Sequence, residues 1–242
     1  MNERNRGELQ TYAGPSELAA ALADAFVTAA NTSSTDRGAF YVALAGGSTP
    51  KAAYALLAQE PRRASVPWND TFVFFGDERC VPPDNEASNY RMAEEAFLRA
   101  VAIPEANVHR MRGEDEPNAA ARAYASVLRS EAPRFDLIML GMGPDGHTAS
   151  LLPGTDPLTD DALLVRAPFV EQVDMRRLTI TPRVINSARL VVIATEGSPK
   201  AAALAAVREG PHDPVRYPIQ IVAPTDGRLL WLVDREAASN LT

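Results

Sequence analysis

The stretch from Phe135 to Gly154, FDLIMLGMGPDGHTASLLPG, limits the possible folds of this chain more than any other stretch. It begins with a run of four apolar residues, LIML at 137–140. An apolar run without polar alternation predicts a strand that is covered on both faces, the usual environment of a parallel strand. Three glycines and a proline follow at 141–146 and allow the backbone to turn tightly. We therefore predict a central parallel strand with a glycine loop at its carboxyl end.

The rest of the chain alternates between strand candidates and helical patterns. Strands are expected at residues 39–45, 71–75, 137–140, 177–181, 189–194 and 229–233. Helices are expected at residues 15–31, 50–58, 89–101, 117–130 and 198–208, with a polar loop at 31–38. Strands that alternate with helices indicate βαβ units. We predict an α/β fold with a doubly wound, mostly parallel sheet, helices on both faces, and one domain that spans residues 1–242.

Composition and charge limit the classes of function. The formal net charge of −7 at pH 7 argues against nucleic acid and against an anionic membrane surface as partners. A small anionic molecule is not excluded, because a few local cations decide its binding. No apolar run approaches the roughly 20 residues of a membrane span, and the N-terminus lacks the apolar segment of a signal peptide. The single cysteine, Cys80, excludes an internal disulfide and suits the reducing cytoplasm in which we expect this protein.

The glycine loop also matches the pattern G-x-G-x-x-G, which is typical of dinucleotide-binding turns. That fingerprint requires a long helix after the third glycine and then a strand that ends in an acidic residue. Here Pro153 and Gly154 end the expected helix after about two turns. The acidic residues at a suitable distance, Asp160 and Asp161, precede the next strand candidate. Dinucleotide binding is therefore disfavoured.

The turn GGSTP, from Gly46 to Pro50, has the form of an anion cradle. Gly46 and Gly47 allow a close backbone approach, and Ser48 and Thr49 offer hydroxyl groups. Pro50 is expected at the first position of a helix whose free N–H groups would face a bound phosphate or carboxylate. A tight turn with Thr49 as the N-cap is the alternative, but it leaves the pair of glycines unexplained.

Charged residues follow the other expected turns. Lys200 lies two residues after Ser198, an expected N-cap, and Lys51 lies just behind GGSTP. A cation in the first helical turn opposes the helix dipole, and a bound anion would offset this cost, although either lysine can equally be a solvated side chain. The charges at 77–79 directly follow a buried strand and are therefore placed at the carboxyl edge of the sheet. Arg79 is a candidate for bidentate anion binding there and Asp77 for positioning a polar group; a solvated loop is the alternative.

His147 is the candidate general base, because a histidine can accept a proton near neutral pH. The start of a helix at His147 would favour its neutral form, and Asp145 or Asp77 would fix its tautomer. A histidine that merely caps a turn is the alternative, and His109 and His212 are expected to be structural. No metal-ligand spacing and no G-x-S-x-G elbow occur, which disfavours a metal site and a serine hydrolase of that type.

Five segments together resemble the 6-phosphogluconolactonase family within a superfamily that includes glucosamine-6-phosphate deaminases. They are GGSTP, GDERCVPPDNEASNYRM, LIMLGMGPDGHTASLLPG, RLTITPRVINSARLVV and GSPKAAAL, and they span about residues 41–204. The resemblance implies a Rossmann-like fold and the hydrolysis of 6-phospho-D-glucono-1,5-lactone in the oxidative pentose phosphate pathway, with no metal or other cofactor.

The resemblance also implies roles for individual residues. His147 would activate water, with Asp145 and Asp77 as supporting carboxylates. Ser48, Thr49, Arg79 and Lys200 would contact the phosphate and the sugar, with Arg177 as a further candidate. The glycines Gly46, Gly47 and Gly143 are also expected contacts, because of the backbone approach that they allow and not from the resemblance. Which of the cations holds the phosphate stays open. The amides of Gly47 and Gly143 are candidate donors to the oxyanion.

One departure from the superfamily favours lactone hydrolysis over deamination. The deaminases carry a glutamate just before the Pro-Gly that follows their DGH motif, and this chain has Leu152 there. Leucine cannot transfer protons. A deaminase-like isomerase and a non-catalytic sugar-phosphate sensor remain the alternatives. The expected partner is a small sugar-phosphate lactone, and the chain is expected to be a monomer or a small homo-oligomer.

Overall fold

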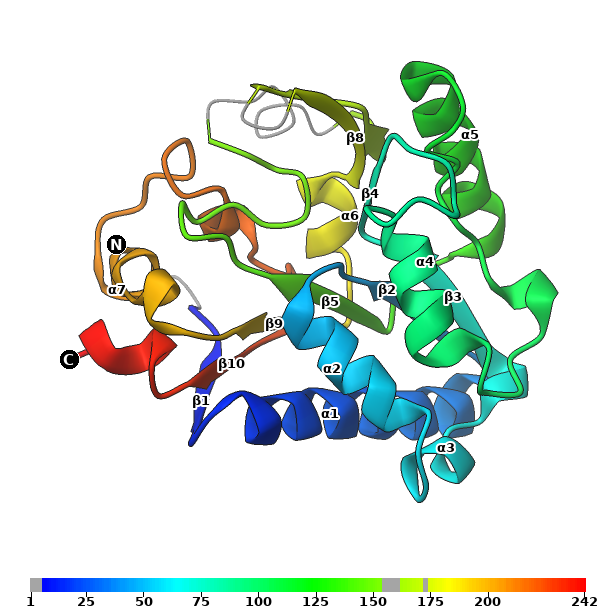
Figure 1. Cartoon of the computed structure of the whole chain (residues 1–242), viewed down its shortest axis with the longest axis horizontal. Coiled ribbons are helices and arrows are strands. Elements are labelled where there is room, and N and C mark those ends of the chain that lie inside the picture. The colour runs from blue at the N-terminus through cyan, green and yellow to red at the C-terminus, as the bar shows by residue number, and fades with distance from the viewer. Residues whose placement is uncertain (1–5, 154–161, 172–173) are drawn as a thin grey trace.

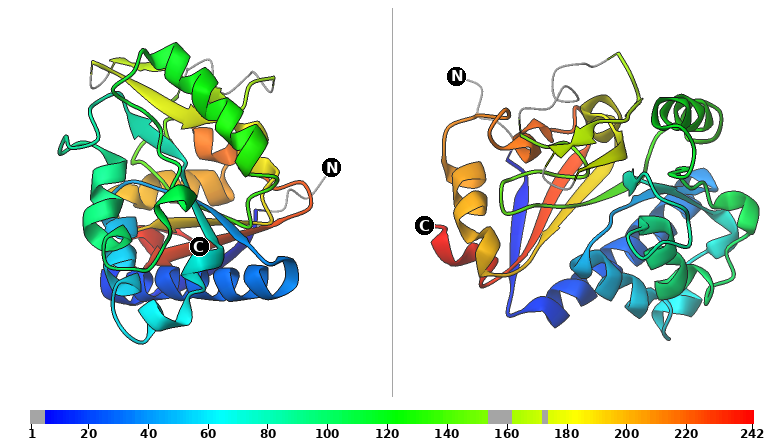
Figure 2. Two further views of the ribbon diagram at one scale, coloured as in Figure 1. Left: turned by 90° about the vertical axis from the view of Figure 1, so that its right-hand side faces the viewer. Right: turned by 45° about the horizontal axis from the view of Figure 1, so that its top comes forward.

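The main sheet has six parallel strands in the order β1-β10-β9-β5-β2-β3 (Figure 1). The computed structural model describes residues 6–153, 162–171 and 174–242. The strands are β1 (Glu8–Tyr12), β2 (Phe40–Leu44), β3 (Thr71–Phe75), β5 (Leu137–Gly141), β9 (Leu190–Thr195) and β10 (Arg228–Asp234). The right-hand view of Figure 2 shows β1 in blue, β10 in red and β9 in gold side by side. The predicted parallel α/β sheet is therefore confirmed.

Helices cover the sheet and a second, smaller sheet lies beyond it. The helices are α1 (Pro15–Arg37), α2 (Ser48–Leu57), α3 (Arg62–Ser65), α4 (Asn89–Ala93), α5 (Pro117–Glu131), α6 (Pro182–Asn186) and α7 (Ala201–Glu209). The second sheet pairs β4 (Asp77–Arg79), β6 (Val165–Arg166) and β7 (Phe169–Val170) with β8 (Met175–Ile180), all antiparallel. Figure 1 shows α1 below the main sheet, and α5 and β8 above it. No helix of the described residues is both long and apolar enough to cross a membrane.

Several elements differ from those expected. Helix α1 continues to Arg37, because the polar segment 31–38 keeps helical geometry until Gly38 ends it in a left-handed conformation. Strand β1 carries no run of apolar residues, so its pattern did not predict a strand. The charged residues 77–79 form β4 rather than a loop. The strand expected at 177–181 is part of β8 and pairs with β4 outside the main sheet.

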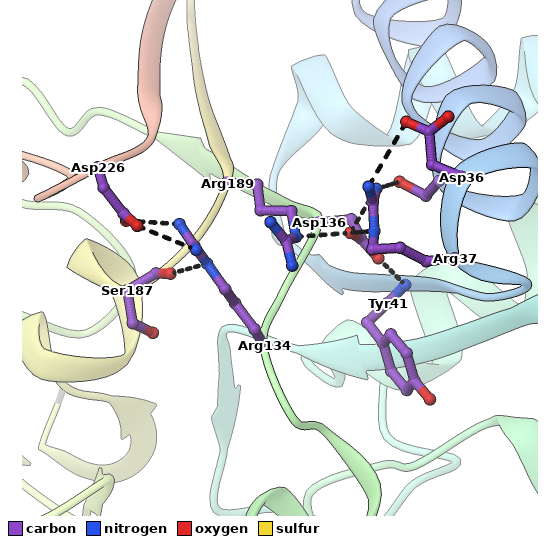
Figure 3. Close-up of polar contacts among 9 residues, drawn as sticks. Asp36, Arg37, Tyr41, Arg134, Asp136, Ser187, Arg189 and Asp226 are labelled. Carbon is purple, nitrogen blue, oxygen red and sulfur yellow. Dashed lines mark hydrogen bonds and ion pairs between the residues drawn. The ribbon is translucent and has the colours of Figure 1, made fainter.

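An ionic cluster fastens the amino end of β5 to its neighbours (Figure 3). The side chain of Asp136, 4% exposed, lies 2.9 Å from Arg37 Nη2 and 3.3 Å from Arg189 Nε. Asp136 Oδ2 also accepts the N–H of Tyr41 at 2.9 Å. A buried carboxylate is costly unless its hydrogen bonds are made. The partners that satisfy Asp136 come from α1, β2 and the start of β9, so the cluster connects these elements to β5.

Asp136→Asn is expected to lower the free energy of unfolding by about 2 kcal/mol, because one carboxylate oxygen would become an amide group that faces a donor. Asp226→Asn is the matched control. Asp226 pairs with Arg134 at 2.6 Å but is 67% exposed, so its loss should cost less than about 1 kcal/mol. Urea unfolding monitored by circular dichroism measures both values, and equal losses would contradict the assignment.

Candidate active site

A cavity of about 300 Å³ lies at the carboxyl edge of the main sheet. Strand β2 has β3 on one side and β5 on the other. The chain therefore reverses direction across the sheet between β2 and β5, which is where open α/β sheets form a crevice. The loops that follow β2, β3, β5 and β9 all contribute to the cavity wall, together with β8 from the second sheet.

Almost all residues predicted for the site meet in this cavity. Those that line it are Gly46, Gly47, Ser48, Thr49, Asp77, Arg79, Gly143, His147, Arg177 and Lys200. Asp145 contacts His147 without lining the cavity. Lys51, which was expected to resemble Lys200, is exposed and does not line it. His109, His212 and Cys80 also lie outside the cavity wall.

His147 and Asp145 form a hydrogen-bonded pair. His147 Nδ1 lies 2.6 Å from Asp145 Oδ1, and the His147 N–H donates to the same oxygen at 3.1 Å. Partial burial of Asp145 opposes its ionisation, but the hydrogen bonds and the charge of His147 outweigh this and lower the pKa of Asp145. An ionised carboxylate beside Nδ1 favours the tautomer that carries its proton there, which leaves the lone pair of Nε2 available as a base.

The glycine loop allows this pair to form. A Cβ atom at Gly143 would overlap both His147 Nδ1 and Asp145 Oδ1. The N–H of Gly143 donates to the carbonyl of His147 at 2.8 Å, so this amide already has an acceptor, which disfavours it as a donor to an oxyanion. The Gly47 N–H has no acceptor among the described residues.

The helix expected after this loop is absent from the residues described up to 153. Thr148 and Leu151 instead pair as an isolated antiparallel bridge, and the Thr148 hydroxyl donates to the carbonyl of Gly141 at 2.8 Å. The helix that was expected to begin at His147 is therefore not present among the described residues. Asp160 and Asp161, weighed above for nucleotide binding, lie outside the described residues.

The GGSTP turn presents free backbone donors to the cavity. Helix α2 begins at Ser48, so Pro50 is its third residue rather than its first, and no side chain caps this end. The first hydrogen bond of the helix runs from Lys51 N–H to the Gly47 carbonyl at 3.1 Å. The N–H groups of Ser48 and Thr49 thus have no acceptor in the described structure. A helix start with free N–H groups is a favourable site for an anion.

Three cations face the cavity, and none of them has a counter-ion among the described residues. Arg79 on β4 is directly opposite Arg177 on β8, and Lys200 ends the 3₁₀ turn Ser198–Lys200 that precedes α7. Ser198 begins that turn; it is not the expected cap. None of the three cations is within 4.0 Å of a carboxylate oxygen in the described residues.

Burial lowers the pKa of two of these cations. It lowers the pKa of Arg177, against the attraction of Asp77, and the like charge of Arg79 lowers the pKa further. Burial also lowers the pKa of Lys200, although the carboxylates of Asp145 and Glu196 oppose this change. Partly buried positive charges are costly unless an anion is near. Since neither cation has an ionic partner in the part of the chain that the structure describes, the cavity is suited to an anionic ligand.

Sequence reasoning missed four polar residues of the site. Asn89 and Ser150 bind the Asp77 carboxylate. Glu196 accepts the Ser48 hydroxyl at 2.9 Å, and Thr195 lines the cavity. Glu196 follows a buried strand directly, so the argument that found 77–79 would also have found it. The part of the chain that the structure describes holds no group of three or more His, Cys, Asp or Glu arranged for a metal ion.

Comparison with known proteins agrees with this geometry. Residues 13–231 match the family model of glucosamine-6-phosphate isomerases/6-phosphogluconolactonase. A 6-phosphogluconolactonase of Synechocystis is 42% identical over 214 residues, which are 85% of this chain and 86% of that protein. The structure of 6-phosphogluconolactonase from Trypanosoma brucei superposes with a TM-score of 0.89 at 29% identity, over 98% of this chain and 99% of the other.

A sibling activity shares the fold. A monomeric glucosamine-6-phosphate deaminase superposes with a TM-score of 0.85 at 20% identity, over 96% of this chain and 99% of the other. That identity supports a common fold and nothing further. The family model and the relative at 42% identity carry the conclusion that this chain belongs to the glucosamine-6-phosphate isomerase/6-phosphogluconolactonase family.

Proposed function

We propose that this chain hydrolyses 6-phospho-D-glucono-1,5-lactone to 6-phospho-D-gluconate, a step of the oxidative pentose phosphate pathway. The observation that carries the proposal is one cavity lined both by His147, which pairs with Asp145 behind it, and by three cations that have no counter-ion in the described part of the chain. The first group can activate water, and the second can bind a phosphorylated, acidic molecule. The names of the similar proteins from Synechocystis and Trypanosoma brucei support the same reaction.

In the proposed reaction His147 acts as the general base. Its Nε2 takes a proton from a water molecule, which attacks the lactone carbonyl, while Asp145 stabilises the imidazolium that forms. The ring C–O bond then breaks, and the proton held by His147 is returned to the leaving hydroxyl group. A lactone is an activated ester, so one base and a few donors to the oxyanion are a sufficient set of groups.

The phosphate is proposed to bind at the start of α2. The free N–H groups of Ser48 and Thr49 and the nearby cation Lys200 all line the same cavity. Binding there would extend the sugar ring toward His147 and hold its carbonyl in a reactive position. Arg79 and Arg177, on the β4–β8 side, would then face the ring and the charge that develops on its carbonyl oxygen.

Leu152 favours this reaction over deamination. It occupies the position where the resemblance places a glutamate in the deaminases, and its side chain is buried and apolar. It has no group that could take part in proton transfer. A chain that only senses sugar phosphates would not need the His147–Asp145 pair, which favours catalysis over sensing.

The experiment that tests the proposal follows release of 6-phosphogluconate from freshly prepared lactone, at a pH where spontaneous opening is slow. The purified chain should accelerate this release and should not release ammonia from glucosamine 6-phosphate. Ammonia release without lactone hydrolysis would favour the deaminase alternative. Binding of the lactone without turnover would favour the sensor.

Lys200→Met is expected to raise KM about tenfold or more and to change kcat little, because a charge-assisted hydrogen bond to phosphate is lost in both the ground state and the transition state. Lys51→Met is the matched control, since Lys51 is exposed and outside the cavity. Steady-state kinetics on the lactone measure both. Equal KM values for the two variants would remove Lys200 from the phosphate site.

A further inference from the structure

The carboxylate of Asp77 is held from two sides. Asp77 is 7% exposed. Its Oδ2 accepts the hydroxyl of Ser150 at 2.7 Å, and its Oδ1 accepts the side-chain amide of Asn89 at 3.1 Å. Asn89 also donates to the main-chain carbonyl of Asp77 at 2.9 Å. One donor on each oxygen fixes the plane of the carboxylate and leaves further lone pairs for a group in the cavity.

Ser150 links Asp77 to the loop that carries His147. It lies three residues after His147 and is fully buried. Between them Ala149 has a φ of 47°, a left-handed conformation that residues other than glycine adopt rarely and that often marks functional sites. The N–H of Ser150 donates to the hydroxyl of Thr179 on β8 at 3.3 Å. The loop is therefore turned so that Ser150 reaches Asp77.

Asn89 is itself fixed by its surroundings. Its N–H donates to Glu78 Oε1 at 2.7 Å, and the hydroxyl of Ser88 donates to Glu78 Oε2 at 3.0 Å. On the opposite side a Cβ atom at Gly46 would overlap the Asn89 amide. The amide therefore fills the space between the anion cradle and Asp77, and it has little freedom to turn away.

We propose that Ser150 and Asn89 are positioning residues of this active site, which hold Asp77 in one orientation toward the cavity. Ser150 additionally couples that orientation to the loop of His147. The inference rests on the proposed lactone hydrolysis and on the role of supporting carboxylate that the family resemblance implies for Asp77. Neither residue needs to touch the substrate. Each acts through Asp77, which faces the cavity beside Arg177.

The test is a double-mutant cycle on lactone hydrolysis. Ser150→Ala should lower kcat about tenfold, as expected for the loss of one hydrogen bond to a charged group, with KM changed less than about twofold. In an Asp77→Asn background the same change should have almost no further effect on kcat, because Ser150 acts through the carboxylate that is already lost. Additive losses in the two backgrounds would overturn the proposal.

A control separates positioning from loop stability. Thr148→Val removes the hydrogen bond from the Thr148 hydroxyl to Gly141 in the same loop without touching Asp77. Its effect on kcat should be the same with and without Asp77→Asn. If Thr148→Val were coupled to Asp77→Asn as strongly as Ser150→Ala is, the loop as a whole would be responsible for the loss of kcat. That result would also overturn the proposal.

Asn89→Ala, on a different element, keeps the inference testable if Ser150→Ala does not fold. Asn89→Ala should show the same loss of kcat and the same lack of additivity with Asp77→Asn.

The experiment distinguishes a failure of the inference from a failure of the proposed function. A wild-type protein that does not hydrolyse the lactone contradicts the function, whereas an active wild type with additive variants contradicts only the positioning role.

Discussion

Replacement of His147 by alanine is expected to lower kcat for lactone hydrolysis by about 10²-fold or more. The imidazole is the only histidine side chain that lines the cavity formed by the described residues, and general bases contribute factors of this size. Its side chain is 30% exposed and lines the cavity, so the truncation enlarges an existing cavity and should change the unfolding midpoint only slightly. Stopped-flow or pH-stat kinetics, corrected for spontaneous opening, measure the loss.

Asp145→Asn tests whether His147 acts as a general base or only binds the substrate. The amide cannot stabilise the imidazolium as a carboxylate does, so kcat should fall by a smaller factor, about tenfold, with KM nearly constant. Added imidazole should restore part of the activity of His147→Ala and none of that of Asp145→Asn. Turnover of His147→Ala equal to that of the wild type would exclude this residue from the mechanism.

Gly143→Ala is expected to lower kcat by about 10- to 100-fold, the second largest effect. The added methyl group would overlap His147 Nδ1 and Asp145 Oδ1, so the ring must move away from its carboxylate. A displacement of about 1 Å at a catalytic group is enough for a loss of this size. Kinetics on the lactone together with a thermal unfolding scan separate a displaced base from a misfolded loop.

Gly141→Ala is the matched control, two residues earlier at the end of β5. A Cβ atom there would lie 3.9 Å from the Ala194 carbonyl oxygen, an ordinary contact. Its kcat should stay within about twofold of wild type. If both alanine variants lost activity equally, the loop as a whole would be sensitive to side chains, and the close approach of Gly143 to His147 would not explain the result.

Local signals were sufficient for much of the site. Most predicted groups lie in the loops after buried apolar strands, and parallel strands place their carboxyl ends at one edge; Arg177, within antiparallel β8, is the exception. This is why GGSTP, Arg79 and His147 meet although they are distant in the sequence. Glu196 obeys the same rule after β9 and was overlooked.

Errors arose where tertiary contacts outweighed local preference. The residues after His147 could form a helical turn by composition. The pairing of Thr148 with Leu151 and the hydrogen bonds of Ser150 hold them in another conformation. By its charges alone, segment 77–79 would be expected to form a solvated loop. In the structure it pairs with β8, and the carboxylates of Asp77 and Glu78 are buried and accept hydrogen bonds from neighbouring donors. Neither outcome is encoded in a window of neighbouring residues.

The sequence by itself determined the class of fold, the edge of the sheet that carries the site and most of the side chains found there, because strand patterns and glycine turns are local properties of the chain. Only the tertiary structure decided which of these groups touch. These contacts depend on register, loop conformation and packing between elements. They are the contact of His147 with Asp145, the hydrogen bonds of Ser150 and Asn89 to Asp77, and the placement of Arg79 opposite Arg177. The stretch 135–154 contains both His147 and Ser150, but Asp77, to which Ser150 donates, comes from β4, more than seventy residues earlier.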